Sequence, residues 1–229
     1  MRKALVCLLG LGLGAGIAQA GPRSWQLRDG GRWQEVAVPS TQPVRDEALD
    51  RVEAKLRARD YGAAHSGVVA WLEANPGSPL RDRALYILGE SNYQRGDLMR
   101  AYYNFEELLD LHPSTPYISA ALQRQYDIAD RFLAGRKDKS ALLFGLRIVP
   151  RIEESIEMLF RVQQRAPGSP LSEKALLRTA DHYYDNGDLD LAIDAYGFYI
   201  RSYPRSPNLP RVKLRKAIAV LRQFRGAKF

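Results

Sequence analysis

Four copies of one short motif, Pro-x-(Ser or Thr)-Pro, divide this chain at regular intervals. The first prolines of the four copies are Pro76, Pro113, Pro167 and Pro204, which lie 37, 54 and 37 residues apart. A repeat period of this size is typical of stacked helix pairs, because one pair cannot bury its apolar face alone and packs it against its neighbours. The spacing therefore predicts an all-α helical-repeat protein, a class whose usual task is to bind other proteins.

Residues 1–20 have the pattern of a cleavable export signal. Two basic residues at positions 2–3 precede an apolar stretch at 5–17, and Ala-Gln-Ala at 18–20 has the small residues of a cleavage site. The apolar stretch is shorter than the ~20 residues that a retained transmembrane helix needs. We therefore expect a mature protein that begins at Gly21 and works in the periplasm or at the inner face of the outer membrane.

The positive charge of the chain is concentrated at its C-terminal end. The whole sequence carries a formal net charge of +8. Residues 204–229 contain eight basic side chains and no acidic one, whereas residues 21–203 are close to neutral. The only cysteine, Cys7, lies inside the export signal, so we expect no disulfide or thiol chemistry in the mature protein and no lipid attached through it.

Residues 21–44 read as a leader and linker. Two short aromatic and β-branched runs, 25–27 and 33–36, flank a glycine-containing turn, which predicts a small N-terminal β-hairpin. Pro-Ser-Thr-Gln-Pro at 39–43 is typical of a linker. We interpret this part as a loosely packed leader before the linker, and a docking element is the alternative.

From residue 45 onward, apolar residues recur at helical spacing in paired blocks. In each pair, the first helix is called helix A and the second helix B. The predicted solenoid covers residues 45–229, with repeats at about 45–80, 81–116, 117–170 and 171–207 and a capping helix at 209–226.

The third repeat is 17 residues longer than its neighbours and contains an insertion at about 135–149. Its second part, 141–149, is apolar. An apolar stretch in a long loop is unusual in water, so it either folds back on the solenoid, which we expect, or meets a partner.

The second block resembles the tetratricopeptide repeat (TPR) family. Leu85, Leu88, Gly89, Ala101 and Phe105 fall at the positions where that family alternates large and small residues before its closing proline. Small residues let the two helices approach closely while large ones fill the seam between them. The fourth block repeats the pattern and the first block follows it more weakly.

Within the TPR proteins, residues 45–225 resemble the BamD (YfiO) family of the outer-membrane β-barrel assembly machinery. The segments Leu88–Tyr93 and Ala192–Tyr196, each beside a Gly-Asp turn, and the over-long third repeat carry the likeness. It implies a non-enzymatic periplasmic scaffold that binds a β-barrel insertase and barrel precursors. BamD proteins usually have a lipidated cysteine at the mature start, where this chain has Gly21. CpoB (YbgF) proteins contain similar repeats, so a Tol–Pal or cell-wall coordinating adaptor is the alternative.

The TPR likeness also implies a partner groove lined by helix A residues. Tyrosines beside charged groups suit an extended peptide, because the ring gives apolar contact and the charges fix the register. Packing on neighbouring helices is the competing interpretation. The residues are Arg83, Tyr86, Glu90 and Tyr93 in the second repeat, and Lys174, Leu177, Asp181, Tyr184 and Asp185 in the fourth.

The capping helix combines an apolar face, which includes Leu214, Ala217, Ile218, Leu221 and Phe224, with many cations on its other faces. A polar end cap is needed by every repeat array. The excess of charge also fits anionic lipid headgroups or an acidic partner surface, whereas export makes nucleic acid an unexpected partner. The basic residues are Arg211, Lys213, Arg215, Lys216, Arg222 and Arg225.

The sequence offers little for catalysis. His65, His112 and His182 are far apart in the chain, and there is no His/Cys metal spacing and no phosphate-binding glycine loop. We therefore expect no enzyme activity, no cofactor, no bound metal and no small-molecule substrate.

Overall fold

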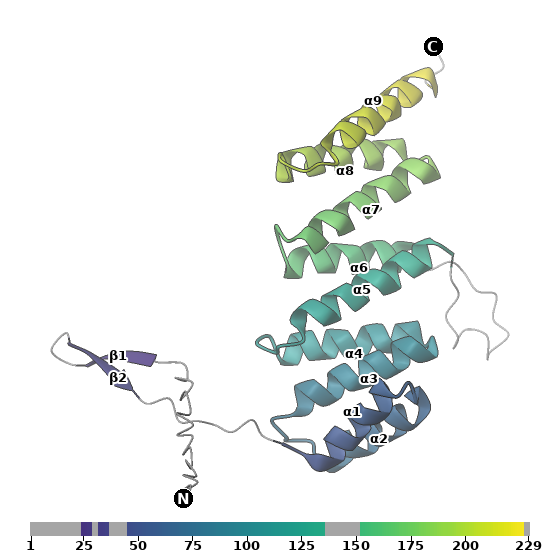
Figure 1. Cartoon of the computed structure of the whole chain (residues 1–229). Helices are drawn as coiled ribbons and strands as arrows, with labels where there is room; N and C mark the ends of the chain where they lie inside the picture. Colours follow the sequence, from purple (N-terminus) through teal and green to yellow (C-terminus); the bar gives the residue numbers. More distant parts are fainter. Residues whose placement is uncertain (1–23, 29–31, 37–44, 136–151, 227–229) are drawn as a thin grey trace, which may run out of the picture. The chain divides into compact units, whose positions relative to one another are not determined.

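A computed structural model describes residues 24–28, 32–36, 45–135 and 152–226 (Figure 1). The chain divides into two units, residues 1–44 and residues 45–229, which are described separately. The export signal, the cleavage site and Cys7 lie outside the described residues. So does the insertion beyond residue 135, including the apolar stretch for which we expected a return onto the solenoid.

In the first unit, two strands form an antiparallel pair, β1 (Ser24–Arg28) and β2 (Arg32–Val36). Their register places Ser24 opposite Val36 and Leu27 opposite Trp33. The predicted N-terminal β-hairpin is therefore confirmed.

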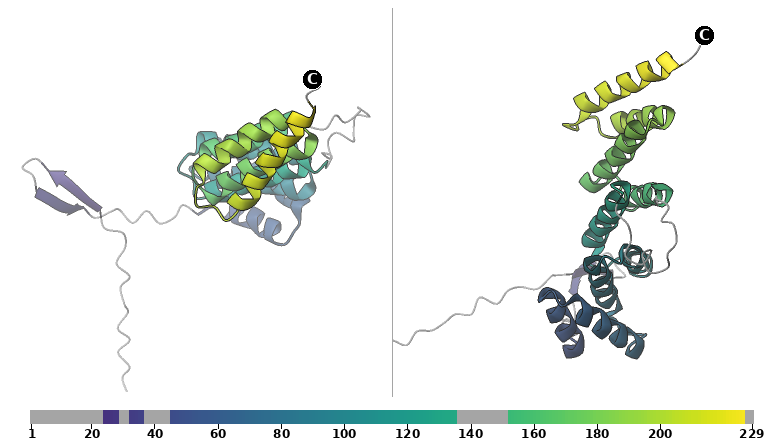
Figure 2. Two further views of the ribbon diagram at one scale, coloured as in Figure 1. Left: turned by 90° about the horizontal axis from the view of Figure 1, so that it is seen from above. Right: turned by 90° about the vertical axis from the view of Figure 1, so that its right-hand side faces the viewer.

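The second unit is all-α in its described residues. Each helix packs on the next one along the chain, so the helices form a continuous stack (Figures 1 and 2). This arrangement confirms the predicted TPR-like solenoid of four helix pairs and a terminal helix. The helices are α1 (Glu47–Arg57), α2 (Tyr61–Ala74), α3 (Arg81–Arg95), α4 (Leu98–Leu111), α5 (Ile118–Leu133), α6 (Ile152–Arg165), α7 (Pro170–Asn186), α8 (Leu189–Ser202) and α9 (Leu209–Gly226).

Gly-Asp pairs make the turn from helix A to helix B. Gly96 ends α3 with φ of 84°, a left-handed conformation that glycine adopts without steric cost. The backbone N–H of Asp97 then donates to the carbonyl of Asn92 (2.9 Å). Gly187 ends α7 in the same way with φ of 89°. The glycine sets the chain direction, and the following aspartate precedes the first residue of helix B.

The hydroxyl of each Pro-x-(Ser or Thr)-Pro motif starts the next helix A. Ser78 accepts a hydrogen bond from the N–H of Leu80 (3.2 Å), and Ser169 caps α7 by accepting from Ser172 (3.1 Å). Such side-chain acceptors satisfy N–H groups that a helix start leaves unpaired. The third and fourth bonds are Tyr117 N–H to Thr115 (3.4 Å) and Asn208 N–H to Ser206 (3.0 Å).

Two of these hydroxyls also join neighbouring repeats. Thr115 Oγ1 donates to Asp82 at the start of α3 (2.8 Å), and Ser206 Oγ donates to Glu173 at the start of α7 (2.6 Å). Asp82 and Glu173 stand at the same place in their repeats, four residues after the preceding motif serine. The hydroxyl of the motif therefore binds the preceding repeat where the residue at this position is acidic.

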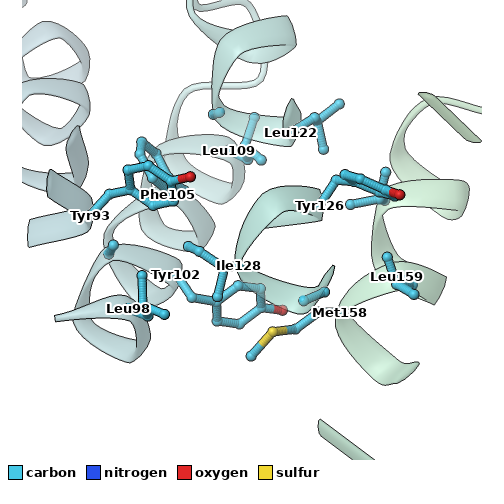
Figure 3. Close-up of a cluster of buried hydrophobic side chains, with 14 of the residues drawn as sticks. Tyr93, Leu98, Tyr102, Phe105, Leu109, Leu122, Tyr126, Ile128, Met158 and Leu159 are labelled. Atoms are coloured by element: carbon cyan, nitrogen blue, oxygen red, sulfur yellow. The ribbon is translucent and has the colours of Figure 1, made fainter. Parts of the chain in front are cut away.

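The core lies in the seams between helices. Gly89 brings α3 so close to α4 that a Cβ added there would lie 2.6 Å from Phe105 Cε1. The largest cluster of buried side chains runs from α3 to α7, and Figure 3 shows its middle part with Phe105, Tyr126 and Leu159. Helices α5 and α6 both contribute to this cluster, so the third repeat keeps the standard seam despite its insertion.

Candidate partner-binding surfaces

A ladder of ion pairs links successive A helices. In α3, Arg83 pairs with Asp50 (2.7 Å) and Glu53 of α1. The same relation recurs between later repeats, with an arginine of one A helix bound to an acid of the A helix before it. The later pairs are Arg124 with Glu90 (2.7 Å), Arg178 with Asp130 (2.5 Å) and Arg215 with Asp181 (3.0 Å).

The predicted groove residues of the second repeat are largely used by this packing. Tyr86 stacks on Tyr117 with ring centroids 4.6 Å apart. Glu90 is 8% exposed and holds Arg124 in a two-pronged contact, while Tyr93 is 4% exposed beneath the guanidinium groups of Arg124 and Arg131. The competing interpretation of the sequence, packing on neighbouring helices, describes the contacts of Glu90 and Tyr93.

The predicted groove residues of the fourth repeat are more accessible. Lys174 is exposed and lies over the ring of Tyr126, with 4.3 Å from Nζ to the centroid. Asp185 is also exposed, and Leu177 and Tyr184 are partly buried. Asp181 accepts from the hydroxyl of Tyr196 (2.7 Å) and pairs with two arginines of α9. The partner role predicted for these nine residues stays a prediction.

The basic helix α9 directs part of its charge inward. Arg211 and Arg215 bind Asp181, and the guanidinium of Arg222 lies 5.3 Å from the ring centroid of Tyr184. Lys213 and Lys216 have no ion pair with any described residue. The side chain of Arg225 lies outside the described residues.

The apolar face of α9 does not form its contact with α8. Among the described side chains of α9, Val212 and Ala219 are fully buried, and they lie on the opposite side of the helix from Leu214 and Leu221. Leu214 is 62% exposed and Leu221 is 58% exposed. Helix α9 therefore presents an open apolar face, which an ordinary polar end cap lacks.

Sequence reasoning missed a cleft among the helices α6, α7 and α8, called here the α6–α8 cleft. Its volume is about 660 Å³. Phe160 of α6 and Phe198 of α8 line it while remaining 55% and 52% exposed. The available signal was two phenylalanines at outward positions of B helices. Its other lining residues include Ile156, Glu157, Tyr183, Ile193, Asp194 and Arg201.

Comparison with known families agrees with this geometry. The model of the tetratricopeptide repeat matches residues 49–116 and 151–207, which together make up more than half of the chain. The chain is a TPR protein. The first matched segment ends before α5 and the second begins at α6, so the gap contains the first helix and the insertion of the third repeat.

Solved structures resemble it only distantly. MamA from AMB-1 is 14% identical, with a TM-score of 0.44 over 78% of this chain and 82% of that one. A thermophilic TPR protein from Thermus thermophilus is 18% identical, with a TM-score of 0.35 over 76% of this chain and 98% of that one. No curated protein matches the sequence. These likenesses give no information about the partner of this TPR protein.

In the TPR array, burial is the main cause of the pKa shifts of several titratable groups. Desolvation lowers the pKa of His65 and His182, with nearby arginines adding to the effect, and raises the pKa of Tyr126 to about 12. His112 ends α4, so the three histidines belong to three different helices. The described residues contain no group of three or more His, Cys, Asp or Glu that could hold a metal ion. None of their helices has the length and apolar character to cross a membrane.

Proposed function

We propose that this TPR protein is a scaffold that holds a segment of a partner protein in the α6–α8 cleft. The observation that carries the proposal is that Phe160 of α6 and Phe198 of α8 line one cleft while more than half of each residue stays exposed. Large aromatic side chains that stay accessible in a concave apolar site are typical anchors of protein interfaces. TPR proteins are typically scaffolds of this kind without catalytic activity.

The cleft also indicates what kind of segment fits. Beside its apolar residues, the cleft is lined by acidic Glu157 and Asp194 and by basic Arg201 and Lys216. Charges of both signs in the lining fix the register of a bound peptide, while the phenylalanines supply contact area. A segment with two or three apolar side chains and mixed charges matches these walls.

The proposed setting is outer-membrane protein assembly in the periplasm, as in the BamD family. The support is the export-signal pattern of residues 1–20 and the resemblance of the repeats, including the long third repeat. In this setting, the partner is a β-barrel insertase or a barrel precursor. A Tol–Pal or cell-wall coordinating adaptor of the CpoB type is the second candidate, supported by the same repeats. A third, direct binding of α9 to anionic membranes, draws on its basic residues, two of which are bound to Asp181.

Crosslinking in intact envelopes tests the proposal. The native protein is compared with a Phe160→Glu/Phe198→Glu double variant and with Leu111→Glu, which changes a 59% exposed leucine at the end of α4, outside the cleft. We expect an insertase among the crosslinked proteins, lost in the double variant and kept in the control. Recovery of Tol–Pal or cell-wall proteins without an insertase would replace the assembly role by the adaptor. Equal recovery with the double variant would exclude the cleft.

A further inference from the structure

Helix α9 occupies the position of a helix A in the repeat register. It follows the motif serine Ser206 as α3 follows Ser78 and α7 follows Ser169. Eleven residues after each serine, the sequence has a small residue, namely Gly89, Ala180 and Ala217. Ala217 therefore stands at the place that receives helix B in the second and fourth repeats.

In those repeats, an aromatic ring of helix B covers the small residue. Phe105 of α4 packs directly on Gly89. In the fourth repeat, Ala180 shares a buried cluster with Tyr196 of α8. Both small residues are buried, whereas Ala217 is exposed. Among the described residues, no helix covers α9 on this side.

An open groove includes Ala217, the position where helix B packs in the second and fourth repeats. Its volume is about 510 Å³, and its lining has little polar surface. Ile200 of α8 forms one wall, and the remaining lining residues belong to α9. Of these, Val220 is 45% exposed and Leu221 is 58% exposed. We call this groove the α9 groove; its lining is Ile200, Lys213, Lys216, Ala217, Val220 and Leu221.

Lys213 and Lys216 give the groove its charge. Neither lysine has an ion pair with a described residue, in contrast to Arg211 and Arg215, which bind Asp181. An apolar groove with two uncompensated cations favours an apolar helix that carries carboxylates at its edge.

We propose that the α9 groove binds an acidic amphipathic helix of a partner protein, which takes the place of a helix B. The chain itself contains a helix of this kind: α4 fills the seam of α3 and has Glu106, Glu107 and Asp110 against the single basic residue Arg100. The inference is separate from the one about the α6–α8 cleft, because it rests on the repeat register; the two sites share only Lys216 among their lining residues.

The charge distribution argues against two other occupants. A second copy that offered its own α9 would bring like charges together, since residues 204–229 have eight basic residues and no acid. A flat membrane surface would not fill a groove with a wall formed by Ile200 of α8. A helix with one protruding aromatic side chain, as Phe105 protrudes from α4, fits the groove at Ala217.

Fluorescence anisotropy with two synthetic peptides tests this proposal on the purified full chain. The first peptide has the sequence of residues 97–113, which covers α4, and the second has lysine in place of Glu106, Glu107 and Asp110. We expect the acidic peptide to bind about tenfold more tightly than the lysine peptide, because charge complementarity sets the choice of partner. Higher salt should reduce this difference.

Two variants locate the binding. Leu221→Glu should weaken binding of the acidic peptide about tenfold, because it places a carboxylate in the centre of the contact. Leu191→Glu on α8, where the leucine is 50% exposed and outside the groove, should leave it unchanged. Circular dichroism checks that both variants fold. Unchanged affinity of Leu221→Glu, or equal binding of the two peptides, would overturn the proposal.

Two further measurements identify a different occupant. A dimer in light scattering that Leu221→Glu dissociates would assign the groove to a second copy. Binding to vesicles with anionic lipid that Leu221→Glu abolishes, without binding of the acidic peptide, would assign it to a membrane. Either result would overturn the partner-helix proposal while leaving the role of the α6–α8 cleft to its own crosslinking test.

Discussion

Tyr93 in α3 and Leu221 in α9 occupy the same position of the repeat, fifteen residues after the motif serine, yet they differ completely in environment. Tyr93 is 4% exposed beneath α5, and Leu221 is 58% exposed. The difference arises because α3 is followed by a helix B and a further repeat, whereas α9 is not followed by another described helix. In a stacked array, the burial of a residue thus depends on the next repeat as much as on its own helix.

The ion pairs between A helices also depend on the neighbouring repeat, in this case the preceding one. Each A helix after α1 has an arginine bound to the repeat before it, and α9 has two, Arg211 and Arg215. Backward contacts of α9 are therefore formed, and among the described residues no helix supplies it with forward contacts. Helix α9 thus resembles the earlier A helices, but among the described residues no helix B packs against it.

The strongest test of this comparison truncates the two equivalent residues. Tyr93→Ala should lower the free energy of unfolding by about 3 kcal/mol, because it removes a buried ring and leaves a cavity. Leu221→Ala should change it by less than about 0.5 kcal/mol, as expected for an exposed side chain. Urea unfolding followed by circular dichroism measures both. Losses of equal size would show that the seam of α9 is filled.

A second test concerns the buried acid in the middle of the array. Glu106 is 7% exposed and accepts from Gln125 (2.6 Å), Arg161 (2.7 Å) and Arg165 (3.1 Å). Glu106→Ala should cost about 2–3 kcal/mol, because Gln125 loses its acceptor and the two arginines lose their buried partner, keeping only the exposed Glu157 and Asp110. Glu157→Ala is the control, since Glu157 binds the same Arg161 from the surface and should cost less than about 0.5 kcal/mol. A similar cost for both would mean that burial does not decide the effect.

Two glycines give the third test. A Cβ at Gly89 meets the ring of Phe105 at 2.6 Å, whereas a Cβ at Gly197 first meets the flexible end of Lys216 at 3.1 Å. Gly89→Ala should therefore destabilise by about 1–3 kcal/mol through overpacking. Gly197→Ala should be neutral or stabilise by up to about 1 kcal/mol, because alanine favours a helix. Thermal unfolding of the two variants compares them, and a stable Gly89→Ala protein would contradict the close helix approach.

The smallest effect is expected from pH at the joint between α7 and α9. Hydrogen bonds from Ser206 and Tyr199 lower the pKa of Glu173 below its ordinary 4.5. A lowered folded-state pKa adds stability above pH 4.5, and that stability is lost as the pH falls through the folded value. Glu173→Gln should thus cost about 0.5–1 kcal/mol at pH 7 and flatten the loss of stability as the pH falls below the ordinary pKa of a glutamate. An unchanged pH profile would contradict the assigned bonds.

Much of the fold could be predicted from local sequence. The motif spacing predicted the helix pairs, because prolines interrupt helices and glycines such as Gly96 and Gly187 allow the left-handed turn between them. The alternation of small and large residues predicted the seam in which Gly89 meets Phe105. The paired aromatic runs near the start predicted the hairpin of β1 and β2. All of these signals act over a few residues, so the sequence displays them directly.

The candidate surfaces were less predictable. Nine helix A residues were expected to line a groove, but Glu90 and Tyr93 are buried in contacts between repeats, and the α6–α8 cleft was missed. Neither the partner of Arg124 nor the exposure of Phe160 and Phe198 follows from helical periodicity. Both depend on residues that are distant in the chain.

The amino-acid sequence by itself determined the repeat period, the helix boundaries and the small residues of the seams, since these follow from backbone conformation and side-chain size. Only the tertiary structure decided which arginine binds which acid, which groove residues are covered, and that the seam of α9 is open. The physical reason is that these properties arise where one repeat packs against the next. One repeat supplies the residues on one side of that contact, and these residues are buried only when a neighbouring repeat packs against them.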